Sequence, residues 1–127
     1  MKRLLLGLTL LVTATAASAE WTISSGNDEY IQYVDTATIR RNGNLVKMWI
    51  LSDYKEVEVF AGKSFLSIRA LSEYDCKDEK IRVLSENGFS GQMGKGRISY
   101  NDEDPKKWFA VAPGTNGEAQ WKIACGK

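Results

Sequence analysis

The side chains best suited to chemistry in this sequence are carboxylates, because the chain contains no histidine. Without an imidazole, Ser–His and Cys–His nucleophilic catalysis and the common histidine metal sites are excluded. Three carboxylates near tyrosines lie in strand-like segments: Asp53, Glu73 and Asp75. A glycosidase would need two of them about 5–9.5 Å apart across a cleft. We interpret them instead as exposed strand charges and predict that the protein is not an enzyme.

The densest acidic cluster, Asp102-Glu103-Asp104, suggests calcium, which takes several oxygen ligands. The cluster lacks the D-x-D-x-D-G spacing with a later glutamate, so a solvated loop before Pro105 is favoured. Neither a metal site nor a cofactor is expected.

Glycines crowd residues 91–96, which superficially suggest a phosphate loop. The motif fails because Lys95 is followed by Gly96 and not by Ser or Thr. A flexible hairpin loop is favoured, and a loop that contacts a partner stays open.

The basic pairs Arg40-Arg41 and Lys106-Lys107 lie near predicted loops and would suit an acidic partner, although ordinary solvated charges are favoured. Without Lys2 and Arg3, the 17 basic residues become 15, against 16 acidic ones. This balance gives no electrostatic case for nucleic acid or an anionic membrane as the main partner.

The first 19 residues have the three parts of a cleavable export signal. Lys2 and Arg3 precede an apolar run over 4–12, and Ala17-Ser18-Ala19 matches the A-x-A cleavage pattern. The run is shorter than the roughly 20 residues of a membrane span. Glu20 stands where a lipid-modified protein needs cysteine, so no lipid anchor is expected. We predict Sec-type export, removal of residues 1–19, and a single domain over 20–127 that is periplasmic, secreted or at the cell surface.

Export makes the two cysteines, Cys76 and Cys125, a predicted disulfide, because an even pair in an oxidising compartment is typically bonded. Two free buried thiols are the alternative. Zinc is disfavoured, since two thiols without histidine do not supply four ligands. The chain-entropy model gives such a crosslink, which encloses about 50 residues, roughly 4 kcal/mol.

Alternation and turn signals predict a sheet. Between Ser64 and Cys76, apolar side chains alternate with polar ones such as Glu73, which is typical of a half-buried antiparallel strand. An Asn-Gly pair at Asn42 favours a tight hairpin turn. Strands are expected at 21–24, 30–34 with a continuation at 37–40, 45–55, 64–76, 80–85, 97–100 and 108–112.

The strand at 45–55 is apolar on both faces near its middle, which indicates a central strand or an interface. Trp49 and Leu51 point to the second face, and we hypothesise that they contribute to an interface, where aromatic residues are enriched.

The last segment is predicted to be a helix. Thr115 and Glu118 match a capping box, and Gly126 suits the C-terminal cap. Cys125 shares a face with Trp121. The expected fold is α+β: a single antiparallel sheet of about five to six strands, with a C-terminal helix packed on it and tethered by Cys76–Cys125.

In the order of its motifs, the chain resembles the surface-adhesin protein E family of Gram-negative bacteria. The segments that carry the resemblance are 47–55, Ser67, 73–76, 93–96, Trp108, 111–115 and Cys125. The resemblance implies a sheet of about six strands with a disulfide-tethered C-terminal helix. It also implies a homodimer and adhesion to host extracellular-matrix and serum proteins.

Two functions therefore follow from the sequence, both with an unidentified protein partner. The first is a non-enzymatic exported binding protein of the adhesin protein E type. The second is a soluble periplasmic regulator or inhibitor of another secreted bacterial protein, which the missing lipid-anchor cysteine suggests.

Overall fold

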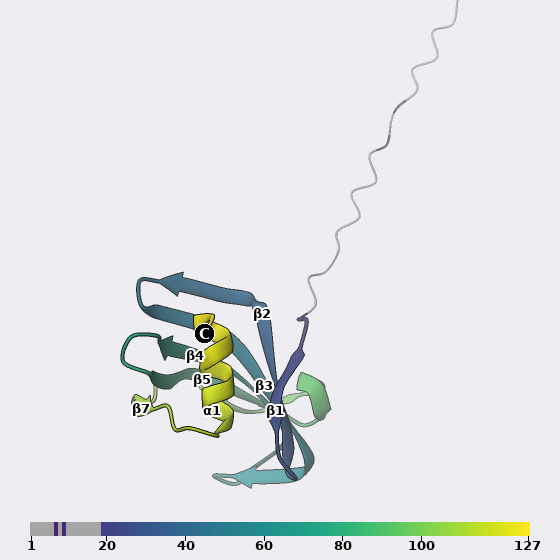
Figure 1. The fold of residues 1–127 in the computed structure, drawn as a ribbon. Coiled ribbons are helices and arrows are strands. Elements are labelled where there is room, and N and C mark those ends of the chain that lie inside the picture. The colour runs from purple at the N-terminus through teal and green to yellow at the C-terminus, as the bar shows by residue number, and fades with distance from the viewer. Residues whose placement is uncertain (1–6, 8, 10–18) are drawn as a thin grey trace, which may run out of the picture.

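The computed structural model describes residues 7, 9 and 19–127, so the predicted signal peptide falls almost wholly outside the described residues. The described part is mostly sheet and ends in a helix (Figure 1). Its elements are β1 (Thr22–Gly26), β2 (Tyr30–Asn42), β3 (Leu45–Phe60), β4 (Lys63–Asp75), β5 (Lys80–Phe89), the 3-10 turn η1 (Gln92–Gly94), β6 (Ile98–Asp102), β7 (Phe109–Ala110) and α1 (Asn116–Cys125).

The strands form one antiparallel sheet in which β1 to β6 lie side by side in chain order. β6 pairs with the end of β5 near Phe89, and β7 pairs with its start at Lys80 and Ile81. The antiparallel sheet with one C-terminal helix is confirmed. The expected count of five to six strands is slightly low, because β7 adds a two-residue strand beside the free end of β5.

Two strands run further than the sequence indicates. β3 continues past the predicted end at residue 55 to Phe60. β5 continues past the predicted end at residue 85 to Phe89 and therefore includes Gly88. A Cβ at Gly88 would lie 3.0 Å from Tyr100 Cβ, so β5 and β6 approach each other at a position that only glycine fits without displacement.

The two predicted pieces of β2 are one strand with an irregular register between Asp35 and Arg40. The Thr38 hydroxyl bridges this irregularity: it donates to the Asp35 carbonyl at 2.6 Å and accepts from the Trp49 amide at 3.0 Å. The Thr38 side chain therefore accepts a hydrogen bond from the Trp49 amide where the hydrogen bonding between β2 and β3 is interrupted.

Helix α1 begins and ends as predicted. The Thr115 side chain accepts from the Glu118 amide at 3.2 Å. Glu118 Oε1 accepts from the Gly114 amide at 3.4 Å and not from Thr115, so the box is half of the usual pair. Gly126 ends the helix with φ 68°, in the left-handed region that favours glycine.

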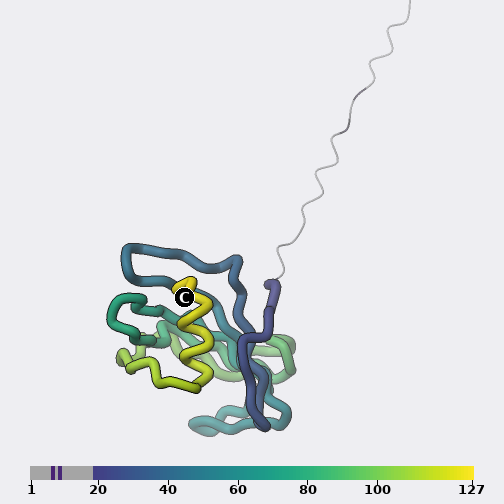
Figure 2. The backbone as a smooth tube through the Cα atoms, in the orientation of Figure 1, coloured from purple at the N-terminus to yellow at the C-terminus, as the bar shows by residue number. Residues whose placement is uncertain are grey.

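The core lies between α1 and one face of the sheet. Val46, Met48 and Tyr74 are fully buried there, and Trp121 packs against them from the helix. The backbone tube shows the helix lying in front of the strands (Figure 2). The Cys76–Cys125 disulfide is present, with the two Cα atoms 5.6 Å apart, and it fixes the helix to the end of β4.

Candidate protein-binding face

Asp53 lies far along the sheet from the other two predicted carboxylates. Asp53 pairs across the sheet with Ser67, and Glu73 lies six residues further along β4, roughly 20 Å away at the usual strand rise. Asp53 Oδ1 accepts from the Met93 amide at 2.8 Å. Asp75 Oδ1 accepts from the amides of the following turn at 2.9 and 3.0 Å. Both side chains hold local backbone in place.

The sequence indicated that Glu73 is an exposed strand charge, but its side chain is buried. The residue is only 5% exposed. Arg82, its register partner on β5, donates from Nε and Nη2 to Glu73 Oε1 at 2.9 and 2.7 Å. The guanidinium also lies 4.6 Å from the centre of the Trp108 ring. Burial is tolerated because the opposite charge stands on the neighbouring strand.

The acidic cluster at 102–104 is bonded within its own loop. Asp102 accepts from the Lys106 ammonium and, at 2.9 Å, from the Asp104 amide. The Lys106 hydrogen bond lowers the pKa of the Asp102 carboxyl. Within the part of the chain that the structure describes, no group of three or more metal-ligating side chains is placed to hold a metal ion.

The basic pairs also make local bonds. Arg40 Nη1 donates to the carbonyls of Ala37 and Ile39 at 3.0 and 2.8 Å. Arg41 Nη2 donates to the Cys125 carbonyl at 3.4 Å. Both arginines therefore donate to backbone carbonyls, Arg40 within β2 and Arg41 at the end of α1.

The glycine-rich loop at 91–96 is fastened to the sheet on the side away from α1. The buried Ser67 hydroxyl donates to the Gly91 carbonyl at 2.7 Å and accepts from the Gly94 amide at 2.9 Å. Together with Asp53, it holds η1 over Leu51, which is fully buried. Leu51 is therefore unable to contact a partner, although Trp49 stays partly exposed.

The remaining surface on that side has an arginine between two aromatic rings. Arg69 is exposed, and its guanidinium lies 4.8 Å from the Trp49 ring centre and 5.8 Å from that of Phe89. Two hollows of about 520 and 340 Å³ flank it, and Trp21 borders both. We call the surface formed by Trp21, Trp49, Arg69 and Phe89 the helix-free face.

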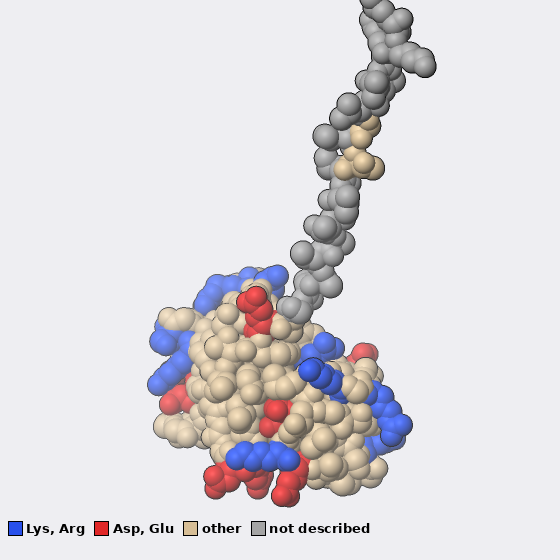
Figure 3. Space-filling model, turned by 90° about the vertical axis from the view of Figure 1, so that its right-hand side faces the viewer, with Lys and Arg blue, Asp and Glu red and all other residues tan. Residues whose placement is uncertain are grey.

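Figure 3 shows the side of the molecule on which β1 and η1 lie. Uncharged side chains cover most of it, and lysines, arginines and acidic side chains lie mainly near its margins. Depletion of charged side chains at the centre of a surface, with charges toward the rim, is typical of protein interfaces.

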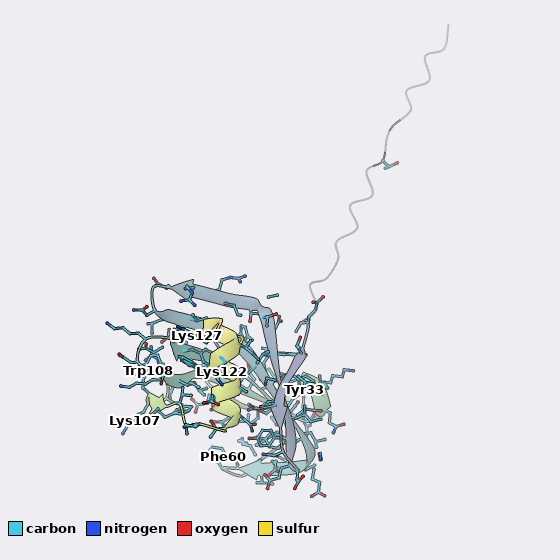
Figure 4. The ribbon with its side chains drawn as sticks, in the orientation of Figure 1. Tyr33, Phe60, Lys107, Trp108, Lys122 and Lys127 are labelled. Atoms are coloured by element: carbon cyan, nitrogen blue, oxygen red, sulfur yellow. A yellow bond between two sulfur atoms is a disulfide. The ribbon has the colours of Figure 1, made fainter. Side chains whose placement is uncertain are left out.

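The hairpin that joins β3 to β4 projects beyond the helix, and it exposes large apolar side chains among its charged ones (Figure 4). Val57, Val59 and Phe60 are 59%, 67% and 60% exposed. Phe60 packs edge-on against Tyr100 with ring centres 5.9 Å apart. The hairpin adds a second apolar surface that the sequence analysis did not single out.

A comparison with models of protein families shows which family this chain belongs to. The model of the family described as surface-adhesin protein E matches residues 21–126. The chain belongs to the surface-adhesin protein E family. A comparison with curated proteins found no match.

Solved structures agree on the fold of this adhesin family member. Crystal form II of Haemophilus influenzae protein E is similar with a TM-score of 0.62 and 14% identity, over 87% of this chain and 97% of that one. Protein E from non-typeable Haemophilus influenzae gives a TM-score of 0.61 and 15% identity, over 87% and 79%. At such low identity the likeness establishes the fold.

Membership supports a surface adhesin, which is not an enzyme class. In the described part of the chain, no helix is long and apolar enough to cross a membrane. The homodimer implied by the resemblance stays a prediction.

Sequence reasoning placed Trp49 on the second face of its strand but did not single out Arg69. Alternation placed Arg69 correctly on the polar side of β4. Its second aromatic neighbour, Phe89, lies beyond the predicted end of its strand at residue 85, so the arrangement of the two rings was not visible. No local signal would have found it: strict alternation from Arg82, an odd number of positions earlier, places Phe89 on the opposite face, and only the register shift between Val83 and Ser85 brings both to the same face.

Proposed function

We propose that this chain is an exported, non-enzymatic adhesin that binds a host extracellular-matrix or serum protein through its helix-free face. The observation that carries the proposal is the exposed Arg69 held between Trp49 and Phe89. Tryptophan and arginine are the residues most enriched in the energetic centres of protein interfaces. Family membership supplies the adhesin class.

The charge of Arg69 is available for recognition. Among the described residues, its guanidinium forms no ion pair and donates one hydrogen bond, to Asn87 Oδ1 at 3.3 Å. A carboxylate on the partner would gain a charge-assisted bond once the surrounding aromatic surface excludes water. The proposal therefore favours a partner segment with an acidic residue beside apolar ones.

Surface plasmon resonance with purified residues 20–127 tests this function against a panel of matrix and serum proteins. The matched variants are Arg69→Ala and Lys122→Ala, which removes an exposed charge from α1. We expect Arg69→Ala to weaken binding about tenfold or more, with Lys122→Ala unchanged. Binding of no panel member, or equal loss in both variants, contradicts the proposal.

Localisation provides a separate test. The proposal requires export after removal of residues 1–19 and exposure at the cell surface. Protease added to intact cells should degrade the protein, whereas a lumenal periplasmic control should survive. Material that is strictly periplasmic and protected would instead favour the regulator or inhibitor of a secreted bacterial protein.

A further inference from the structure

A cleft of about 710 Å³ opens on the α1 side of the sheet, beside the start of the helix. Its borders are the turn between β1 and β2 and the segment from β7 to α1, and its floor is formed by the central strands. The volume lies in the range of about 300–1,000 Å³ found for small-molecule sites. Of the described residues that line it, none is charged.

Two amide side chains are built into this cleft. Gln32 and Gln120 are only 9% and 5% exposed. Gln120 Nε2 donates to Gln32 Oε1 at 2.6 Å, and Gln32 Nε2 donates to Ser52 Oγ at 3.2 Å. Gln120 Oε1 accepts from the Tyr74 hydroxyl at 2.9 Å. Each amide nitrogen has two hydrogens, so each retains one donor beyond these bonds.

Ser72 adds a third buried polar group. It is 1% exposed and lines the same cleft, and its Oγ lies near the Tyr74 hydroxyl but forms no hydrogen bond of standard geometry among the described residues. A buried hydroxyl without a partner destabilises a fold, and such groups are rare in native proteins. An apolar residue would suit the neighbouring Ile50 and Val83 better, so stability alone does not explain this serine.

We propose that the cleft binds an uncharged ligand in which an apolar body carries an amide head. The amide carbonyl would accept from the spare hydrogens of Gln32 or Gln120, and the amide N–H would donate to Ser72 Oγ. The apolar body would pack against the wall formed by Ile81 and Phe109. A charged head is disfavoured, because burying it without an opposite charge is costly.

An NMR titration of ¹⁵N-labelled residues 20–127 tests the site with two probes of the same shape. N-acetyl-leucinamide is uncharged, and N-acetylleucine replaces its terminal amide with a carboxylate. We expect the amide to shift the side-chain resonances of Gln32 and Gln120, and the carboxylate to bind about tenfold more weakly or worse. Equal binding of both probes, or shifts confined to the helix-free face, would overturn the proposal.

Ser72→Ala separates ligand binding from a structural role. Because the Ser72 hydroxyl makes no hydrogen bond of standard geometry, its removal should leave the melting temperature nearly unchanged while lowering affinity for the amide about fivefold or more. Ser85→Ala, on the other face of the same sheet, is the matched control and should bind normally. A Ser72→Ala protein that binds the amide as tightly as the parent would overturn the assignment of Ser72 to the ligand site.

A third probe distinguishes the source of the amide. Acetyl-Gly-Ser-Leu-Ser-Gly-amide presents the same leucine within an uncharged peptide. Binding much tighter than N-acetyl-leucinamide would support the site and assign its ligand to a polypeptide segment. Equal affinity would support the site and assign it to a free small molecule.

Discussion

The two faces of this sheet differ in what covers them. On one face α1 packs against Met48 and Tyr74 and is fixed there by the disulfide. On the other, the loop carrying η1 covers Leu51, and Arg69 stays at the surface between aromatic rings. The first face joins elements far apart in the sequence, whereas the second presents side chains to solvent.

This difference separates stability from recognition. Substitutions of the apolar core residues beneath the helix should change the free energy of unfolding, and substitutions at exposed positions of the helix-free face should mainly change binding. Ser67 is an instructive exception, because it is buried on the helix-free side and supports the loop. The following experiments test the separation from its largest effect to its smallest.

Removing the disulfide should have the largest effect. The bond joins residues 49 positions apart, and the chain-entropy model assigns a loop of this size about 4 kcal/mol. We expect Cys76→Ala with Cys125→Ala to lower the free energy of unfolding by about that amount, measured by urea denaturation. Amide exchange should accelerate most in α1. An unchanged unfolding midpoint would show that packing alone holds the helix.

Removing the Ser67 hydroxyl should have an intermediate and local effect. Ser67→Ala leaves the Gly91 carbonyl and Gly94 amide without their partner, which corresponds to about 1–3 kcal/mol. Hydrogen exchange should rise at 91–96 while α1 stays protected. Ser99→Ala, whose hydroxyl makes a longer bond of 3.4 Å, is the control. Faster exchange in α1 would mean that the two faces are coupled.

Removing the Tyr74 hydroxyl should have the smallest effect at neutral pH. Tyr74→Phe leaves Gln120 Oε1 without its donor, which we expect to lower stability by about 1 kcal/mol in urea denaturation.

The same variant should alter the response to alkali. Burial raises the pKa of Tyr74 above the usual value for tyrosine. The folded state therefore keeps a proton that the unfolded chain loses above about pH 10, so stability falls as pH rises. Tyr74→Phe should remove up to about 1.4 kcal/mol per pH unit of this loss. Tyr33→Phe on β2, labelled in Figure 4, should retain it. Identical alkaline slopes in all three proteins would contradict the assignment.

Local signals were sufficient for the elements that depend on local chemistry. The cap at Thr115, the glycine stop at Gly126 and the turn at Gly43 are set by nearby backbone, and all three are where the sequence predicts. The pairing of Cys76 with Cys125 was predictable because two cysteines admit one intramolecular bond.

Features set by a neighbouring strand were not predictable. Glycine weakens an isolated strand, yet Gly88 belongs in β5 because Tyr100 approaches it closely. Glu73 fits the polar side of an alternating strand, yet Arg82 allows it to be buried. The candidate site depends on the same information, since Arg69 lies between residues from two different strands, and the cleft combines Gln32 with Gln120 across 88 positions of sequence.

The disulfide also gives the chain a ring. Cys76 and Cys125 are 49 positions apart, and the segment between them holds β5, β6, β7, most of α1 and the loops that join them. A protease that cuts once within those loops opens the ring but releases no fragment, because the two pieces of the chain stay covalently joined through the disulfide. A protein exposed to extracellular proteases can therefore be nicked there and still keep its helix attached to the sheet.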